Sequence, residues 1–129
     1  MARTKVFRHI FRFEGFMGSV KLAIKGIVYL FLYHRNMRII FMLGIAALLL
    51  GFYLNLKGIE LVALCITITL VFMAEIFNTA IELLIDISKD KYHTLIKLVK
   101  DISAAVVLLA SLNAMAVGYI LFIRKIFVR

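Results

Sequence analysis

The sequence predicts an all-α integral membrane protein: an N-terminal amphipathic surface helix followed by three transmembrane helices, forming one domain over residues 1–129. Hydrophobic residues make up 64% of the 129 residues, and the mean hydropathy is +1.04. Soluble domains are nearer half apolar, so composition alone favours the membrane. The chain has no Pro and only seven Gly, so no segment is marked as a linker between domains.

Residues 1–37 are expected to lie in the membrane interface. The stretch SVKLAIKGIVYLFLYHRN places Lys21 and Lys25 four residues apart, on one face of a helix whose remaining surface is apolar. Such a helix lies at the headgroup level, with its lysines near anionic lipid. The basic and aromatic piece KVFRHIFRF precedes it and fits the same role. Simple anchoring, without a part in catalysis, is the alternative for both pieces.

Three later stretches, all within residues 38–123, are long and apolar enough to cross a bilayer, which takes about 20 residues. They cover residues 39–56, 59–87 and 102–123, and the second is apolar only as far as residue 74. Each is expected to be a helix, because an open strand cannot satisfy its backbone hydrogen bonds in lipid.

The basic residues predict the topology. Eight Lys and Arg precede Ile39, and four lysines follow the second span, so both regions are expected on the cytoplasmic side. Three spans then place the C-terminus outside, although Arg124, Lys125 and Arg129 argue mildly against this. The net charge of +9 suits nucleic acid or anionic lipid. Because the charges cluster beside apolar spans, we expect lipid and no nucleic acid.

The end of the second span has polar residues at helical spacing. Glu75, Asn78, Glu82 and Asp86 fall on one narrow face of a helix. A carboxylate at membrane depth is costly and indicates function. Counting about 20 residues from Ile59 places Glu75 just inside the cytoplasmic boundary, with the later acids toward water. This arrangement fits a reaction between one lipid-embedded and one water-borne reactant.

A second polar group begins the third span. Lys100 and Asp101 are expected in the same cytoplasmic layer as Glu82 and Asp86, and small residues at 104, 105 and 110 would let another helix approach closely. At helical spacing, this helix presents a stripe of Lys97, Lys100, Asp101, Ala104, Leu108 and Ser111. Acids with lysines nearby can hold Mg²⁺ and phosphate, since Mg²⁺ takes one or two carboxylates together with phosphate oxygens.

Ordinary structural roles remain open for each of these groups. Glu82 and Asp86 can be solvated acids at a helix end, Lys100 and Asp101 an interface ion pair, and Glu75 a structural or proton-relay carboxylate. The sequence contains no phosphate-binding glycine loop and no protein-kinase signature. The residues by themselves therefore support a metal–phosphate site at a membrane surface and cannot name ATP.

The blocks AEIFNTAIELLID, KYH and KDISAAVV, in this order and spacing, closely resemble the small integral-membrane prokaryotic diacylglycerol kinase family. That family's pattern is E-x-x-N-[ST]-A-I-E-x-x-x-D, then a Tyr-His pair, then K-D-x-x-[AS]-A-A/V. Residues 16–123 fit its layout of a surface helix and three spans. The block RNMRI at 35–39 resembles the Gram-positive branch, whose members are similar to undecaprenol kinases.

The resemblance implies a homotrimer with active sites shared between subunits, in the bacterial inner membrane as a multi-pass protein with a cytoplasmic N-terminus. It implies ATP as co-substrate and Mg²⁺ as metal. By position, Glu75 matches the general base and Glu82 a metal-binding glutamate that also touches nucleotide. Further positions that match the nucleotide site or its surroundings are Asn78, Asp86, Lys91, Tyr92, His93, Lys100 and Asp101.

This chain departs from the family pattern in its first part. The family usually has a metal-binding glutamate just before RNMRI, where this chain has His34, and Leu22 replaces a nucleotide-contacting Tyr. Ile40 stands where Gram-positive members often have His. His34 can ligate a metal, but Mg²⁺ prefers oxygen. An exposed interface residue without a metal is the equal alternative for His34.

The leading hypothesis is transfer of the γ-phosphoryl group of ATP to the hydroxyl of a membrane lipid, either undecaprenol or diacylglycerol. The spans contain no motif specific for either headgroup. One rival is a proton- or cation-coupled transporter that uses Glu75 as its coupling site, although Glu75 lies near one membrane face rather than mid-span. Another rival is a degenerate, noncatalytic family member.

Overall fold

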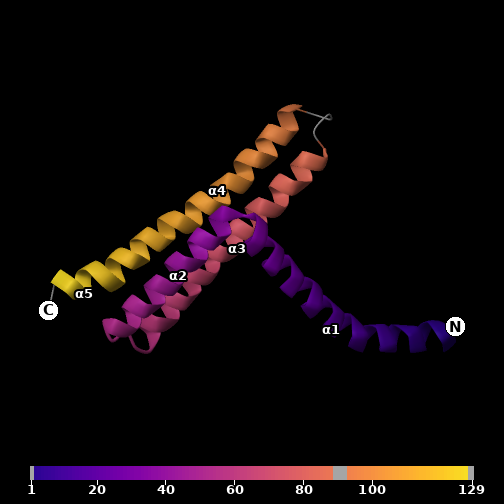
Figure 1. Ribbon diagram of the computed structural model, residues 1–129, viewed down its shortest axis with the longest axis horizontal. Coiled ribbons are helices and arrows are strands. Elements are labelled where there is room, and N and C mark those ends of the chain that lie inside the picture. The colour runs from indigo at the N-terminus through magenta and orange to yellow at the C-terminus, as the bar shows by residue number, and fades with distance from the viewer. Residues whose placement is uncertain (1, 89–92, 128–129) are drawn as a thin grey trace. The chain divides into compact units, whose positions relative to one another are not determined.

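The computed structural model describes residues 2–88 and 93–127, which are helical apart from short connections. The helices are α1 (Ala2–Tyr33), α2 (Arg35–Tyr53), α3 (Ile59–Ile87), α4 (His93–Gly118), the π-helix η1 (Tyr119–Ile123) and α5 (Arg124–Phe127) (Figure 1). The chain forms two compact units, Met1–Arg35 and Asn36–Arg129, which are described separately.

The first unit is the single long helix α1, which joins the two pieces expected from the sequence. The Tyr29 ring lies 4.9 Å from the ring of Tyr33 and 5.8 Å from that of His34, measured between centroids. Its part Gly15–Tyr33 is long and apolar enough to cross a membrane, so the described residues hold four such helices rather than three. Length and composition do not distinguish a surface helix from a span here, and the surface placement stays a prediction.

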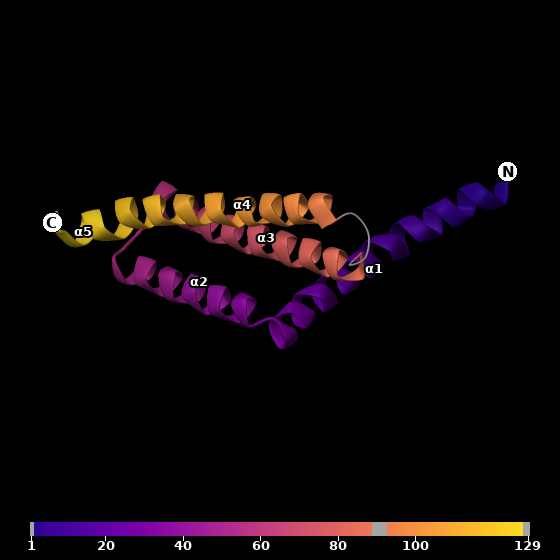
Figure 2. The same ribbon diagram turned by 90° about the horizontal axis from the view of Figure 1, so that it is seen from above.

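The second unit contains α2, α3 and α4, which run up and down beside one another. Figures 1 and 2 both show α3 and α4 side by side. The bounds of α3 agree with the predicted 59–87. Helix α2 begins and ends earlier than predicted, at Arg35 and Tyr53, and α4 begins at His93, well before the predicted residue 102. Hydropathy identifies only the apolar part of a helix. Residues 93–102 contain no Pro or Gly that would end the helix, so α4 extends beyond its apolar part.

Side chains of α3 pack against two glycines of α2. A Cβ atom added at Gly44 would lie 3.1 Å from Ile68 Cγ2, and one at Gly51 would lie 2.9 Å from Leu64 Cδ2. The atoms next to both glycines belong to side chains of α3, so the small residues on α2 make room for these side chains. The rings of Phe41 and Phe72, 5.9 Å apart and edge to face, complete this contact.

The end of the bundle farthest from the acidic row is fixed by a small core and an ion pair. Leu56, Leu64 and Leu121 are buried together. Lys125 Nζ donates a hydrogen bond to Glu60 Oε2 at 2.7 Å, which joins α5 to the start of α3. The charge of Lys125 is thereby neutralised, so it argues less strongly against an external C-terminus than its type suggests. Glu60, which ends the apolar run at this side, has a structural role.

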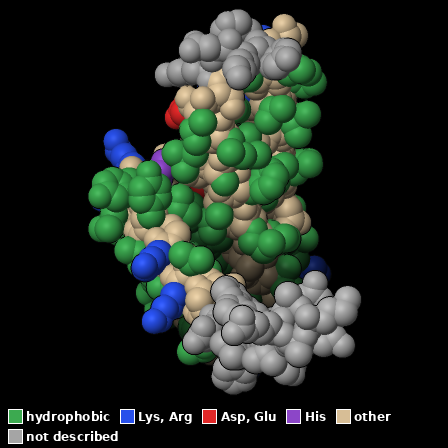
Figure 3. All heavy atoms as spheres, turned by 90° about the vertical axis from the view of Figure 1, so that its right-hand side faces the viewer, with side chains coloured by type: hydrophobic (Ala, Val, Ile, Leu, Met, Phe, Trp, Pro, Cys, Tyr) green, Lys and Arg blue, Asp and Glu red, His purple; other side chains and the backbone are tan. Residues whose placement is uncertain are grey.

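The surface of the described residues is largely apolar. On the described part of the face seen in Figure 3, hydrophobic side chains far outnumber charged ones, and many large ones, such as Leu49, Ile66 and Leu109, are more than half exposed. Lipid is the solvent that such a surface fits. The fold is therefore that of an all-helical membrane protein.

Candidate functional site

The polar residues at the end of α3 lie on one face and change from buried to exposed along the helix. Glu75 is buried, with 7% of its surface exposed. Asn78 is half-buried, and Glu82 and Asp86 are exposed. Exposure within the protein thus rises along this face from Glu75 to Asp86. The predicted depth of these residues in the membrane stays a prediction.

A hydroxyl on α4 connects this row to the neighbouring helix. Ser103 is 2% exposed, and its Oγ lies 2.9 Å from Asn78 Oδ1 and 3.0 Å from the carbonyl oxygen of Lys100. A serine hydroxyl has one hydrogen, so the two acceptors share it. Asn78 Nδ2 in turn donates to Glu82 Oε1 at 3.4 Å. Glu82, Asn78 and Ser103 therefore form one chain of hydrogen bonds across two helices.

The chain of hydrogen bonds fixes the orientation of the Asn78 amide. If the amide were turned over, its oxygen would face the Glu82 carboxylate, and two acceptors would meet without a hydrogen. With the amide as it is, Asn78 donates toward Glu82 and accepts from Ser103. One oxygen of Glu82 is held by this bond while the side chain remains exposed and open to a ligand.

The hydrogen bond also sets the level of α4 against α3. The two helices run antiparallel, so Lys100, three residues before Ser103, lies about 4.5 Å nearer the exposed end of the acidic row. That displacement brings Lys100 level with the turn of α3 that contains Glu82. Lys100 and Asp101 are both exposed.

The face of α4 that packs on α3 is not the predicted stripe, which remains open to the approach of another helix. Ser103 is buried and Val107, Ala110 and Ala114 are half-buried, whereas Ala104 and most of its predicted stripe are exposed. Ser103 was not among the predicted site residues, and neither was Thr79, which is 3% exposed on α3. The spacing of three from Lys100 was the available signal for Ser103, but a small hydroxyl residue in an apolar run is unremarkable by itself.

The remaining predicted residues belong to the first unit or lie near the start of α4. Lys91 and Tyr92 lie outside the described residues. His93 is the first residue of α4, but the description does not extend to its side chain. His34 belongs to the first unit, so its predicted metal role stays a prediction. Among the described residues, no three His, Cys, Asp or Glu side chains gather around a common point that could hold a metal ion.

These observations define a class: an all-helical membrane protein with a network of a carboxylate, an amide and a hydroxyl that joins two of its long apolar helices. Comparison with known proteins narrows this class. Residues 21–122 match the prokaryotic diacylglycerol kinase family. The chain belongs to this family, as the resemblance of its motifs predicted.

Two curated relatives support the assignment. The chain is 38% identical to a diacylglycerol kinase of Synechocystis sp. over 101 residues, which are 78% of this chain and 58% of that protein. It is 35% identical to an undecaprenol kinase of Bacillus subtilis over 81 residues, which are 63% of this chain and 66% of that protein. The matched part thus spans less than two thirds of the length of each relative.

The contact between Asn78 and Ser103 predicts a coupling energy between the two positions. In a double-mutant cycle of Asn78→Ala and Ser103→Ala, we expect a coupling of about 1 kcal/mol in the free energy of unfolding, since each variant removes the same hydrogen bond. Unfolding in mixed detergent micelles measures it. Ser111→Ala, on the same helix, replaces Ser103→Ala in the control cycle, where additive effects are expected. Additivity in both cycles would contradict the hydrogen bond.

Proposed function

We propose that this protein is an ATP-dependent lipid kinase, which transfers the γ-phosphoryl group to the hydroxyl of a membrane lipid. Membership of the prokaryotic diacylglycerol kinase family and the names of both relatives support this proposal. Family membership also favours a kinase over the transporter considered from the sequence. The central structural observation is the buried Glu75 on the same α3 face as the exposed Glu82.

The two carboxylates are separated in a way that suits two reactants. Glu75 and Glu82 are about 10 Å apart along the helix axis, at about 1.5 Å per residue. A lipid hydroxyl at headgroup depth meets Glu75, which accepts its proton as the oxygen attacks the γ-phosphorus and ADP leaves. The nucleotide lies farther out, near Glu82 and Lys100. Catalysis then depends mainly on positioning and on stabilisation of the phosphoryl charge.

Mg²⁺ fits the side chains that this site offers. Glu82 presents exposed carboxylate oxygen, and Mg²⁺ takes one or two carboxylates, phosphate oxygens and water rather than a full protein cage. Bound Mg²⁺ would supply positive charge to the phosphate oxygens. The Lys100 ammonium adds charge from α4, with Asn78, Asp86, Asp101, Lys91, Tyr92 and His93 as the proposed surroundings of the nucleotide.

The lipid acceptor is either diacylglycerol or undecaprenol, the substrates that the two relatives' names indicate. The motif RNMRI favours undecaprenol. We further propose the bacterial inner membrane as the location, with a cytoplasmic N-terminus and α1 on the anionic surface. In this topology the acidic end of α3 faces the cytoplasm, where ATP is available.

Replacing Glu75 tests the function. Purified wild-type protein with ATP and Mg²⁺ is expected to phosphorylate one or both lipids in a radiolabel-transfer assay. Glu75→Gln keeps the shape but cannot accept the proton, so we expect a loss of about a hundredfold or more in kcat. Glu60→Gln, in the ion pair at the other end of α3, is the matched control with activity near wild type. Retained activity in Glu75→Gln would remove Glu75 as the base, and no transfer by wild type would indicate a noncatalytic member.

Replacing Glu82 tests the metal site. Glu82→Gln keeps a partner for Asn78 but removes the negative charge, so the Mg²⁺ concentration for half-maximal activity is expected to rise about tenfold. Mg²⁺ titrations of lipid phosphorylation, with ATP in excess, measure this concentration. If kcat fell while the Mg²⁺ dependence stayed unchanged, Glu82 would act on the substrate and not on the metal.

A homotrimer is the proposed assembly, and one amide supports contact with a second copy. Asn113 is exposed on α4, where it lines a largely apolar groove with Phe77, Leu109 and Ala110. An amide that faces hydrocarbon forgoes hydrogen bonds, whereas a neighbouring helix can supply them. Exposed Ala104 and Ala105 on the same helix would allow the close approach expected from the sequence.

The role of Asn113 in assembly can be measured directly. Asn113→Leu is expected to weaken association by about 1 kcal/mol, a fivefold rise in the dissociation constant, because interhelical amide bonds in membranes contribute about this much. Analytical ultracentrifugation in density-matched detergent reports the distribution of oligomers. Leu109→Asn, which adds an amide to the same groove instead of removing one, is the reciprocal control. A trimer as stable as wild type in Asn113→Leu would show that this groove faces lipid.

A further inference from the structure

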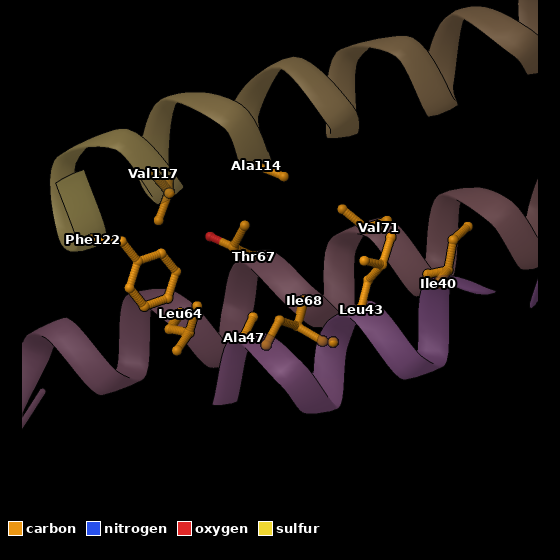
Figure 4. Close-up of a pocket in the computed structure, with 12 residues that line it drawn as sticks. Ile40, Leu43, Ala47, Leu64, Thr67, Ile68, Val71, Ala114, Val117 and Phe122 are labelled. Carbon is orange, nitrogen blue, oxygen red and sulfur yellow. The ribbon is translucent and has the colours of Figure 1, made fainter. Parts of the chain in front are cut away.

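An apolar pocket of about 210 Å³ lies between α2, α3 and α4 (Figure 4). Its polar lining group is Thr67, whose hydroxyl donates to the carbonyl oxygen of Ala63 at 2.7 Å and is therefore satisfied. The pocket is larger than the cavity of about 150 Å³ that binds benzene inside a protein. It offers a ligand apolar contact and no free hydrogen bond, so its chemistry suits hydrocarbon.

The pocket lies on the same face of α3 as the acidic row. Thr67, Val71 and Glu75 follow one another at intervals of four residues, and the first two line the pocket. Val71 lies about 6 Å and Thr67 about 12 Å below Glu75 along the helix axis. If the hydroxyl of a lipid alcohol lies at Glu75, its hydrocarbon chain extends into the membrane along α3. The part of the chain nearest the hydroxyl then reaches the pocket.

We infer that this pocket binds the first carbons of the hydrocarbon chain of the lipid alcohol whose hydroxyl meets Glu75, and that Phe122 at its far end determines how much of that chain the pocket holds. The inference rests on the proposed lipid kinase activity. The helix of a second copy does not fit, since one turn of helix, about 5.4 Å long and 10 Å wide, occupies roughly twice the pocket volume.

The backbone around Phe122 is unusual in the way that binding sites often are. Residues 119–123 form a π-helix, a wide helical turn. Such turns are rare in proteins, but those that occur are often found at functional sites. Within this wide turn, Leu121 is buried in the core and Phe122 is half-buried against the pocket. In Figure 4 the Phe122 ring lies between Val117 and Leu64, at the opposite end of the pocket from Ile40. A large side chain at the closed end sets how deep a chain can reach.

Two variants with opposite effects test this role. Phe122→Ala deepens the pocket, and Ala114→Leu fills it from α4. The full-length protein in nanodiscs receives ATP, Mg²⁺ and a series of lipid alcohols: diacylglycerols with short to long chains, and prenols from farnesol to undecaprenol. We expect the ratio of kcat/KM for long over short chains to rise about tenfold in Phe122→Ala and to fall in Ala114→Leu, since one methylene in an apolar pocket changes selectivity by this order. Phe127→Ala, which is 80% exposed on α5, is the matched control with an unchanged ratio.

Photolabelling separates this inference from the proposed function. A lipid alcohol with a diazirine in its chain is expected to label peptides of α3 and α4 that line the pocket, and unlabelled lipid alcohol to compete. Competed labelling without phosphorylation supports the pocket and overturns the kinase proposal. Phosphorylation with the same chain preference in both variants overturns the pocket inference and leaves the kinase intact. Labelling that excess lipid alcohol does not reduce also overturns it, because bulk lipid or a partner's side chain then fills the space.

Discussion

The hydrogen bond between Ser103 and Asn78 is the contact on which the arrangement of the site depends. Helices in lipid gain little from burying apolar side chains against each other, so their relative level must be fixed by close packing and a few polar contacts. The Ser103 hydroxyl lies 2.9 Å from Asn78 Oδ1, and this contact fixes which turn of α4 lies beside which turn of α3. It also orients the amide that holds Glu82. A slip of one turn would move Lys100 about 5.4 Å from its level beside the acids.

Helix α3 combines two environments on a single face. Its first part lines an apolar pocket through Thr67 and Val71, and its last part presents Glu75, Asn78 and Glu82 in order of increasing exposure. A continuous helix satisfies its own backbone throughout, so the change from lipid to water costs no hydrogen bonds. The same face can therefore bind the apolar and the polar part of one amphipathic molecule.

The sequence predicted much of this arrangement because the membrane imposes simple rules. The bounds of α3 followed from the apolar run and the helical spacing of the acids beyond it. The early start of α4 could not be found from hydropathy, because a helix can continue into water without an apolar side. Ser103 could not be recognised as a site residue either. The sequence does not distinguish a buried serine in a helix from an exposed one, because the difference arises from tertiary contacts. Whether Gly15–Tyr33 lies on the surface is not decided by its length and hydropathy, which suit a span as well.

The ion pair between Glu60 and Lys125 has a consequence for biogenesis. In the proposed topology, the basic end of the last helix must pass through the hydrocarbon layer, which opposes the transfer of positive charge. Glu60, at the beginning of α3, supplies a counter-charge at the far side, 2.7 Å from the lysine in the finished structure. Because the pair needs both helices, Glu60 can contribute to the orientation of α4 only once α3 is in place.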